Sequence, residues 1–118
     1  MSSPSKIKGN TFEREVVNQA RKFGLKSVRA YASNGISLGE AEDVDIKIEE
    51  IKGQCKRRKR IAKWLKPPDS CDIALVREDR GETYVIIEYD NFLEIVAYMK
   101  EMRNNGDTTK KSSMFDDK

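Results

Sequence analysis

Residues 43–66 read DVDIKIEEIKGQCKRRKRIAKWLK, and this stretch decides the fold. It consists of two short strand-like runs followed by a dense run of cations. Asp43 and Asp45 alternate along the first run, so a strand would place both carboxylates on one face. Gln54 and Lys56 have the same relation in the second run. If the two runs pair, we expect these four side chains to converge on one patch that can hold a divalent metal beside a phosphate.

Positive charge is concentrated next to this patch. The net charge of the whole chain is only +3. From residue 50 to residue 66, however, a single acid, Glu50, is accompanied by eight basic residues: Lys52, Lys56, Arg57, Arg58, Lys59, Arg60, Lys63 and Lys66. Such asymmetry indicates one face that meets an anionic partner, with nucleic acid as the first candidate. The alternative is an ordinary solvated basic helix.

Length and composition exclude several classes of protein. A chain of 118 residues suffices for one modest core. The two cysteines, Cys55 and Cys71, make no secreted disulfide framework, and Cys55 would point away from the expected patch. The absence of histidine excludes His-ligated zinc and Ser-His or Cys-His catalysis. Without a signal peptide or a membrane-length apolar run, we expect a cytoplasmic protein with no membrane partner and no small-molecule cofactor.

The chain before this stretch predicts a mobile lead, a helix, a strand and a loop. Residues 1–8 are polar, and Asn10 with Glu13 has the pattern of a capping box that opens a helix. Glu13 either caps that helix or faces inward toward a partner or metal. The helix carries an apolar stripe and a glycine stop: Val16, Val17, Ala20, Phe23 and Gly24. Residues 26–31 predict a strand, and residues 32–39 predict a loop that either approaches a ligand or merely connects.

The chain after the second run predicts a helix over 57–65, with Ile61, Trp64 and Leu65 buried. Strands over 71–76 and 83–89 predict a hairpin around Arg80–Gly81, with the run Val-Ile-Ile inside the sheet. Asn91 and Glu94 form a second capping box, before a helix whose inward side carries Phe92, Ile95, Val96 and Met99. We therefore expect one domain over 9–103, a disordered tail over 104–118, and the order α-β-β-β-α-β-β-α. This is an α/β class with a mixed sheet flanked by helices.

Four successive motifs resemble those of the PD-(D/E)xK nuclease superfamily. They read KGNTFERE from residue 8, VRAYASNG from residue 28, EDVDI from residue 42 and QCKRR from residue 54. The similarity is greatest to archaeal-type Holliday junction resolvases and their phage relatives, and it extends over about residues 8–98. It implies a restriction-endonuclease-like fold, a homodimer, branched DNA as the partner and Mg²⁺ as the cofactor, with Mn²⁺ as a substitute.

The resemblance also implies roles for individual residues. The catalytic set would be Glu13, Asp43 or Asp45, Gln54 and Lys56, with the metal held by Glu13, Asp43, Asp45 and Gln54. Carboxylate and amide oxygens suit Mg²⁺, while Lys56 would orient the attacking water or neutralise developing charge. The DNA contacts would come from Lys8, Arg14, Ser33, Arg57, Arg58, Lys59, Arg60 and Lys63.

Two departures from the family pattern leave alternatives open. Alternation does not choose between Asp43 and Asp45, where the family has one aspartate. Gln54 stands where the family has glutamate, which removes one charge from the metal site. It is either a natural variant or an inactivating replacement. The sequence therefore predicts a structure-selective resolvase, with a noncatalytic nucleic-acid-binding module or a nuclease acting on flaps or linear DNA as alternatives.

Overall fold

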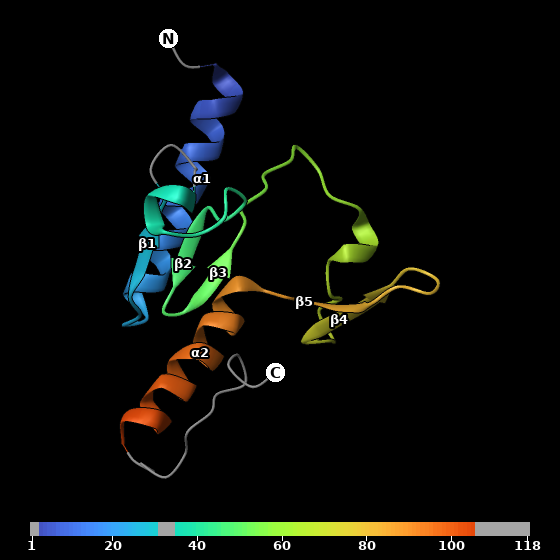
Figure 1. The fold of residues 1–118 in the computed structure, drawn as a ribbon. Coiled ribbons are helices and arrows are strands. Elements are labelled where there is room, and N and C mark those ends of the chain that lie inside the picture. The colour runs from blue at the N-terminus through green and yellow to red at the C-terminus, as the bar shows by residue number, and fades with distance from the viewer. Residues whose placement is uncertain (1–2, 31–34, 106–118) are drawn as a thin grey trace.

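The computed structural model describes residues 3–30 and 35–105, and in these ranges the chain is a mixed α/β protein with two small sheets (Figure 1). The helices are α1 (Pro4–Lys22) and α2 (Tyr89–Asn104). The strands are β1 (Ser27–Arg29), β2 (Ile46–Ile48), β3 (Ile51–Gly53), β4 (Ile73–Arg77) and β5 (Thr83–Ile87). Two short 3₁₀ helices, η2 (Gly35–Leu38) and η3 (Lys63–Leu65), lie between strands. The predicted α/β class is confirmed at this level.

The helix α1 begins earlier than the sequence predicts. Pro4 is its first residue, a position where the fixed φ of proline fits and its missing N–H costs nothing. Asn10 therefore lies inside the helix, and the predicted cap at Asn10 is wrong. Residues 4–8, which we expected in a mobile lead, form the first turns of α1. The predicted stop is confirmed, because Gly24 adopts a φ of 79°.

One core joins α1, the first sheet and α2. Its buried residues are Val17, Ala20, Leu25, Ile46, Ile48, Leu93 and Val96, with Val16 and Phe23 packed at its edge. The predicted stripe of α1 is thus confirmed. The helix α2 begins at Tyr89 with Glu88 at its N-cap instead of at Asn91, and its inward face includes the predicted Phe92 and Val96 together with Leu93. Leu93 is fully buried and Ile95 is exposed, so the predicted second capping box and the inward position of Ile95 are wrong.

The first sheet is antiparallel in the order β1-β2-β3. The helix α1 contacts β1 and β2. Ile46 pairs with Gly53, and a Cβ at Gly53 would lie 2.8 Å from Cδ1 of Ile46, so glycine lets this buried isoleucine cover the strand. The turn between β2 and β3 contains Glu49 in the left-handed region, at a φ of 53°. This pairing is what brings residues 45 and 55 to the same end of the sheet.

The predicted basic helix over 57–65 is wrong. Residues 54–62 contain no helix or strand, and η3 is a single short turn. Five consecutive cations would repel one another across the turns of a helix. No apolar face compensates for this repulsion, because Ile61 and Trp64 are exposed instead of buried. The observed order is therefore α-β-β-β-β-β-α, without the middle helix.

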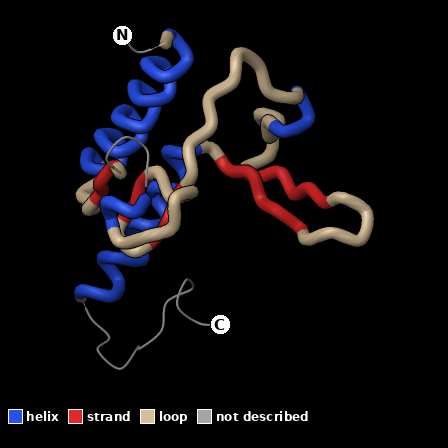
Figure 2. Tube along the Cα trace, turned by 45° about the horizontal axis from the view of Figure 1, so that its top comes forward, coloured by secondary structure: helices blue, strands red, loops and turns tan. Residues whose placement is uncertain are grey.

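The strands β4 and β5 form a separate antiparallel hairpin, which projects away from the first sheet (Figures 1 and 2). The predicted turn at Arg80–Gly81 is confirmed, with Arg80 at a φ of 64°. The prediction of one continuous mixed sheet is wrong, since the two sheets share no strand. The run Val-Ile-Ile lies in β5 of this two-stranded sheet and is therefore not a central strand covered on both faces, and Val85 is 55% exposed. In the described residues, no helix has the length and apolar character needed to cross a membrane.

A polar cluster around Glu49 ties α2 to the first sheet. Its Oε2 accepts the backbone N–H of Lys26 at 2.7 Å and Nζ of Lys100 at 2.9 Å. Nζ of Lys100 also donates to the carbonyl of Gly24 at 3.1 Å. Burial alone would raise the pKa of Glu49, but the Lys26 N–H and the Lys100 ammonium outweigh it and hold the pKa below its ordinary value.

We expect Glu49→Gln to reduce stability at neutral pH by about 1 kcal/mol, because a charged acceptor is lost. A lowered pKa in the folded state stabilises the fold above the ordinary glutamate pKa, and the stabilisation is lost as pH falls through the folded value. The variant should therefore lose less stability than the wild type between about pH 5 and pH 3. Denaturant unfolding at a series of pH values measures this. Glu50→Gln is the control, because Glu50 is an exposed neighbour in the same turn. If both variants reduced the pH dependence of the free energy of unfolding equally, that dependence would not come from Glu49.

Candidate active site

Asp45 is held at the end of the first sheet by three hydrogen bonds. It lies directly before β2 and is 9% exposed. Its backbone N–H donates to the carbonyl of Gly53 at 2.9 Å, and its carbonyl accepts the N–H of Ala30 at 2.8 Å. Its side-chain Oδ2 accepts the backbone N–H of Cys55 at 2.7 Å. The sheet therefore fixes both the position and the orientation of this carboxylate.

Glu13 brings a second carboxylate to the same region from α1. It is 5% exposed and lies one and two turns before Val17 and Ala20, on the helix face that meets the core. Burial, together with smaller contributions from the negative charges of Glu13 and Asp45, raises the pKa of the Cys55 thiol to about 11. Both carboxylates thus lie within electrostatic range of Cys55. The inward reading of Glu13 is confirmed by its burial.

Asp43 does not share a face with Asp45. The strand begins at Ile46, and Asp43 lies in an exposed turn before it. The prediction that the two aspartates alternate along one strand is therefore wrong, because residues 42–43 turn instead of extending. Of the two aspartates, Asp45 is the one whose carboxylate the fold buries.

Gln54 and Lys56 follow the end of β3 and are both exposed. Between them, Cys55 is half-buried and packs against the core. Cys55 thus points away from Gln54 and Lys56, as predicted, but it is Cys55 that lies on the buried side with the acids. The hydrogen bond from the Cys55 backbone N–H to Oδ2 of Asp45 holds the Cys55 backbone next to this carboxylate. Gln54 and Lys56 flank that bond on its solvent side.

Tyr89, the first residue of α2, completes the inner wall of the site. Its hydroxyl donates to the carbonyl of Val16 at 2.7 Å. Burial raises the pKa of Tyr89 to about 12, with smaller contributions from Cys55 and Asp90. Neither Cys55 nor Tyr89 was predicted from the sequence to belong to the site. The only sequence signal for Cys55 was its place between two candidate residues.

The two buried carboxylates are of the ligand type that a hard divalent cation takes, since Mg²⁺ accepts carboxylate oxygens together with water or phosphate oxygens. Among residues 3–30 and 35–105, no cluster of three or more histidine, cysteine or acidic side chains is arranged to hold a metal. Within these ranges, the amide of the exposed Gln54 offers a further oxygen ligand.

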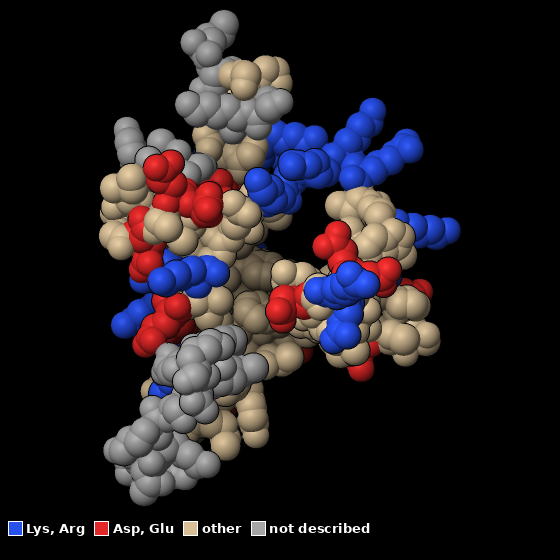
Figure 3. All heavy atoms as spheres, turned by 45° about the vertical axis from the view of Figure 1, so that its right-hand side comes forward, with Lys and Arg blue, Asp and Glu red and all other residues tan. Residues whose placement is uncertain are grey.

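Residues 56–66, called here the basic segment, extend from this site. All seven of its cations are exposed: Lys56, Arg57, Arg58, Lys59, Arg60, Lys63 and Lys66. The sequence has no acid between residues 51 and 68. Figure 3 shows Lys and Arg side chains gathered in one patch, with acidic side chains to either side. Lys52 is occupied elsewhere, since its Nζ lies 2.9 Å from Oε1 of Glu40.

The remaining predicted DNA contacts are on or near α1. Lys8 and Arg14 are exposed on that helix. Ser33 lies outside the described residues, as does most of the predicted tail, residues 106–118. The structure thus places Lys8 and Arg14 on the surface and leaves the predicted role of Ser33 as a prediction.

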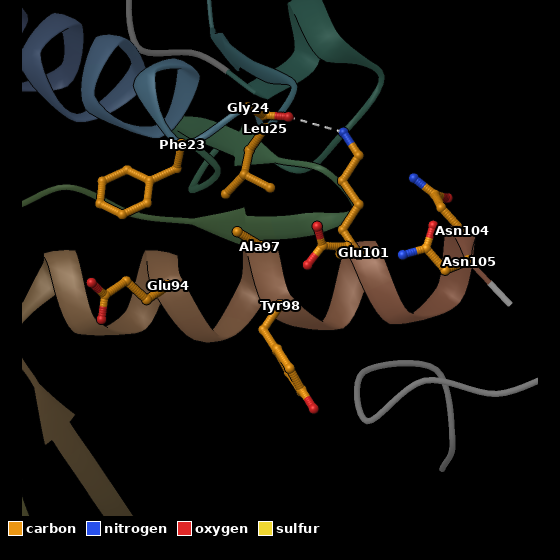
Figure 4. A pocket seen from close by; sticks show the side chains of 10 residues that line it. Phe23, Gly24, Leu25, Glu94, Ala97, Tyr98, Glu101, Asn104 and Asn105 are labelled. Atoms are coloured by element: carbon orange, nitrogen blue, oxygen red, sulfur yellow. Dashed lines mark hydrogen bonds between the residues drawn. The ribbon is translucent and has the colours of Figure 1, made fainter. Parts of the chain in front are cut away.

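A hollow of about 500 Å³ lies elsewhere, between the end of α1 and the outer half of α2 (Figure 4). Phe23, Leu25 and Ala97 line its apolar side, and Glu94 and Glu101 line its rim. Neither Glu13 nor Asp45 lines it. The hollow is therefore separate from the buried acids.

Comparison of the chain with protein-family models, with curated proteins and with solved structures found no match.

Proposed function

We propose that this protein is a divalent-metal-dependent endonuclease that cuts branched DNA, with the four-way junction as its preferred substrate. The observation that carries the proposal is that two buried carboxylates, Glu13 and Asp45, both act electrostatically on Cys55. The basic segment begins at the next residue, Lys56. Two carboxylates alone would repel a phosphate, whereas the adjoining cations attract the DNA backbone toward them. A DNA substrate implies work in the cytoplasm of a bacterial, archaeal or phage-infected cell.

In the proposed reaction Glu13 and Asp45 would hold Mg²⁺, or Mn²⁺ in its place, and the amide oxygen of Gln54 would be available as a further ligand. Such a cation would supply Lewis-acid polarisation of the scissile phosphate and activation of a water molecule. The Cys55 N–H fixes the orientation of the Asp45 carboxylate. The exposed ammonium of Lys56 orients the attacking water or neutralises charge that develops on the phosphate.

The direct test is incubation of the protein with labelled four-way, flap and linear DNA, each with Mg²⁺, with Mn²⁺ and with a chelator. We expect metal-dependent cleavage, fastest on the four-way junction. Faster cleavage of flaps or linear ends would favour another nuclease activity on the same site. Salt-sensitive binding without any cleavage would favour a noncatalytic nucleic-acid-binding module, the alternative that the uncharged Gln54 supports.

Gln54 gives a prediction of its own. A carboxylate next to the buried acids adds one negative ligand for a hard cation, so Gln54→Glu should tighten metal binding several-fold and raise the cleavage rate. Titration of cleavage against Mg²⁺ concentration measures both effects. Gln54→Met, of similar length but without oxygen, separates the added charge from the loss of the amide.

The opposite result has a defined meaning. If Gln54→Glu lowers cleavage, while a second change, Asp43→Asn, restores it, then Asp43 already supplies the missing charge and the site is rewired but competent. Absence of cleavage in every combination would leave the noncatalytic module as the better reading.

We also propose that the protein acts as a homodimer, because two matched cuts require two sites related by symmetry. The hairpin offers a self-complementary surface. Its outer face pairs Leu75 with Val85 and Ile73 with Ile87 across the strands, and Leu75 is 66% exposed. An isolated two-stranded hairpin is marginally stable in water, so burial of this apolar face by a second copy would stabilise it.

The expected result is a dimer at micromolar concentration by analytical ultracentrifugation, converted to a monomer by Val85→Lys. Tyr84→Lys is the matched control, because Tyr84 is also exposed but lies on the opposite face of β5. A wild-type monomer, even with junction DNA bound, would argue against paired cutting.

A further inference from the structure

The single tryptophan of the chain, Trp64, is exposed near the C-terminal end of the basic segment. Its exposed fraction is 68%, although tryptophan is highly buried on average in folded proteins. Lys63 directly precedes it, and Lys66 follows two residues later. A large aromatic ring that is left in solvent and flanked in sequence by cations can serve as a stacking surface for a base.

The ring is presented by a constrained turn. The N–H of Leu65 donates to the carbonyl of Ala62 at 3.0 Å, and the N–H of Lys66 donates to the carbonyl of Lys63 at 3.1 Å. Leu65 is half-buried and anchors the turn, while the adjacent Trp64 is not covered. Pro67 and Pro68 follow and restrict the backbone beyond it. Little conformational freedom is therefore left to lose when a ligand meets the ring.

We propose that Trp64 stacks on an unpaired base, and that the basic segment therefore binds single-stranded DNA or the open centre of a branch in preference to closed duplex. This inference rests on the proposed nucleic-acid binding, but it needs neither the metal nor cleavage. In a continuous duplex each base is covered by its neighbours on both faces. A single strand or a branch point exposes a face, which the indole covers while adjacent cations contact the phosphates.

The lone tryptophan makes the test direct, because its fluorescence reports on one residue. Three polyanions are titrated into the full-length protein: an oligothymidylate, a long blunt-ended duplex without unpaired bases, and inorganic polyphosphate. We expect strong quenching by the oligothymidylate and little by the other two at equal occupancy. Equal quenching by polyphosphate would show that Trp64 senses charge without stacking, and would overturn the inference. A signal that changes on dilution of the protein but not with DNA would place Trp64 against a second copy, and would also overturn it.

Two variants measure the effect on affinity by fluorescence anisotropy of labelled oligothymidylate. Trp64→Leu should bind about tenfold more weakly, with the slope of log K against log salt unchanged, because it removes an aromatic face and no charge. Trp64→Phe should retain most of the affinity. Circular dichroism should show the fold intact, since the side chain is exposed. Unchanged affinity of Trp64→Leu would overturn this inference alone, whereas loss of DNA binding by the wild type would overturn the proposed function as well.

Discussion

Asp45→Asn is expected to lower metal-dependent cleavage of junction DNA at least about a hundredfold, because it removes one of the two buried charges proposed to hold the cation. Binding of the junction should stay within a few-fold, since phosphate contacts come from the basic segment. The amide oxygen of asparagine can still accept the N–H of Cys55, so the hydrogen bond that holds this end of the sheet survives. Single-turnover cleavage and anisotropy measure the two quantities separately.

The matched control is Asp43→Asn, an identical change two residues away in an exposed turn. It should keep most of the activity if the buried carboxylate is the metal ligand. Equal losses from both changes would mean that both aspartates bind the metal. Full activity in Asp45→Asn would remove the proposed site, and thermal unfolding of each variant separates a chemical effect from misfolding.

The second large effect is expected from the double change Arg57→Gln and Arg58→Gln. Each lost phosphate contact should lower the steepness of log K against log salt by about one unit, so the double variant should lose about two units. Its affinity for DNA at moderate salt should fall about tenfold or more. Anisotropy titrations at four or five salt concentrations give both numbers.

Lys22→Gln with Arg103→Gln removes the same charge from exposed positions on α1 and α2. This control should leave the slope unchanged, because neither residue belongs to the basic segment. If both double variants lose the same affinity with the same slope, the protein attracts DNA through its overall charge, and the segment has no special role.

Local patterns in the sequence predicted the elements that pack against the core. The stripe from Val16 to Phe23, the stop at Gly24 and the turn at Arg80–Gly81 are all short-range features, and each is found in the structure. The predicted capping boxes at Asn10 and Asn91 are also short-range features, but they were overridden. Pro4 starts α1 earlier, and the packing of Leu93 fixes the face of α2.

Features that depend on contacts between distant parts of the chain could not be predicted from the sequence. Ile61, Trp64 and Leu65 have helical spacing, but no neighbouring surface covers Ile61 or Trp64, so the repulsion among the cations prevails. Which of residues 54–56 lies on the side of the buried acids depends on where β3 ends and on the hydrogen bond from the backbone N–H of Cys55 to Asp45. Tyr89 reaches the carbonyl of Val16 across 73 positions of the chain, which no local pattern encodes.

The β4–β5 hairpin also bears on cooperativity. Since its strands pair with each other and with no strand of the first sheet, it can open without disturbing the core. Its amides should then exchange with deuterated solvent at a rate set by local unfolding, well before those of β1–β3. If a second copy covers its outer face, protection of these amides must increase with protein concentration while protection of the first sheet stays constant. The free energy of opening of one hairpin thereby becomes a measure of self-association.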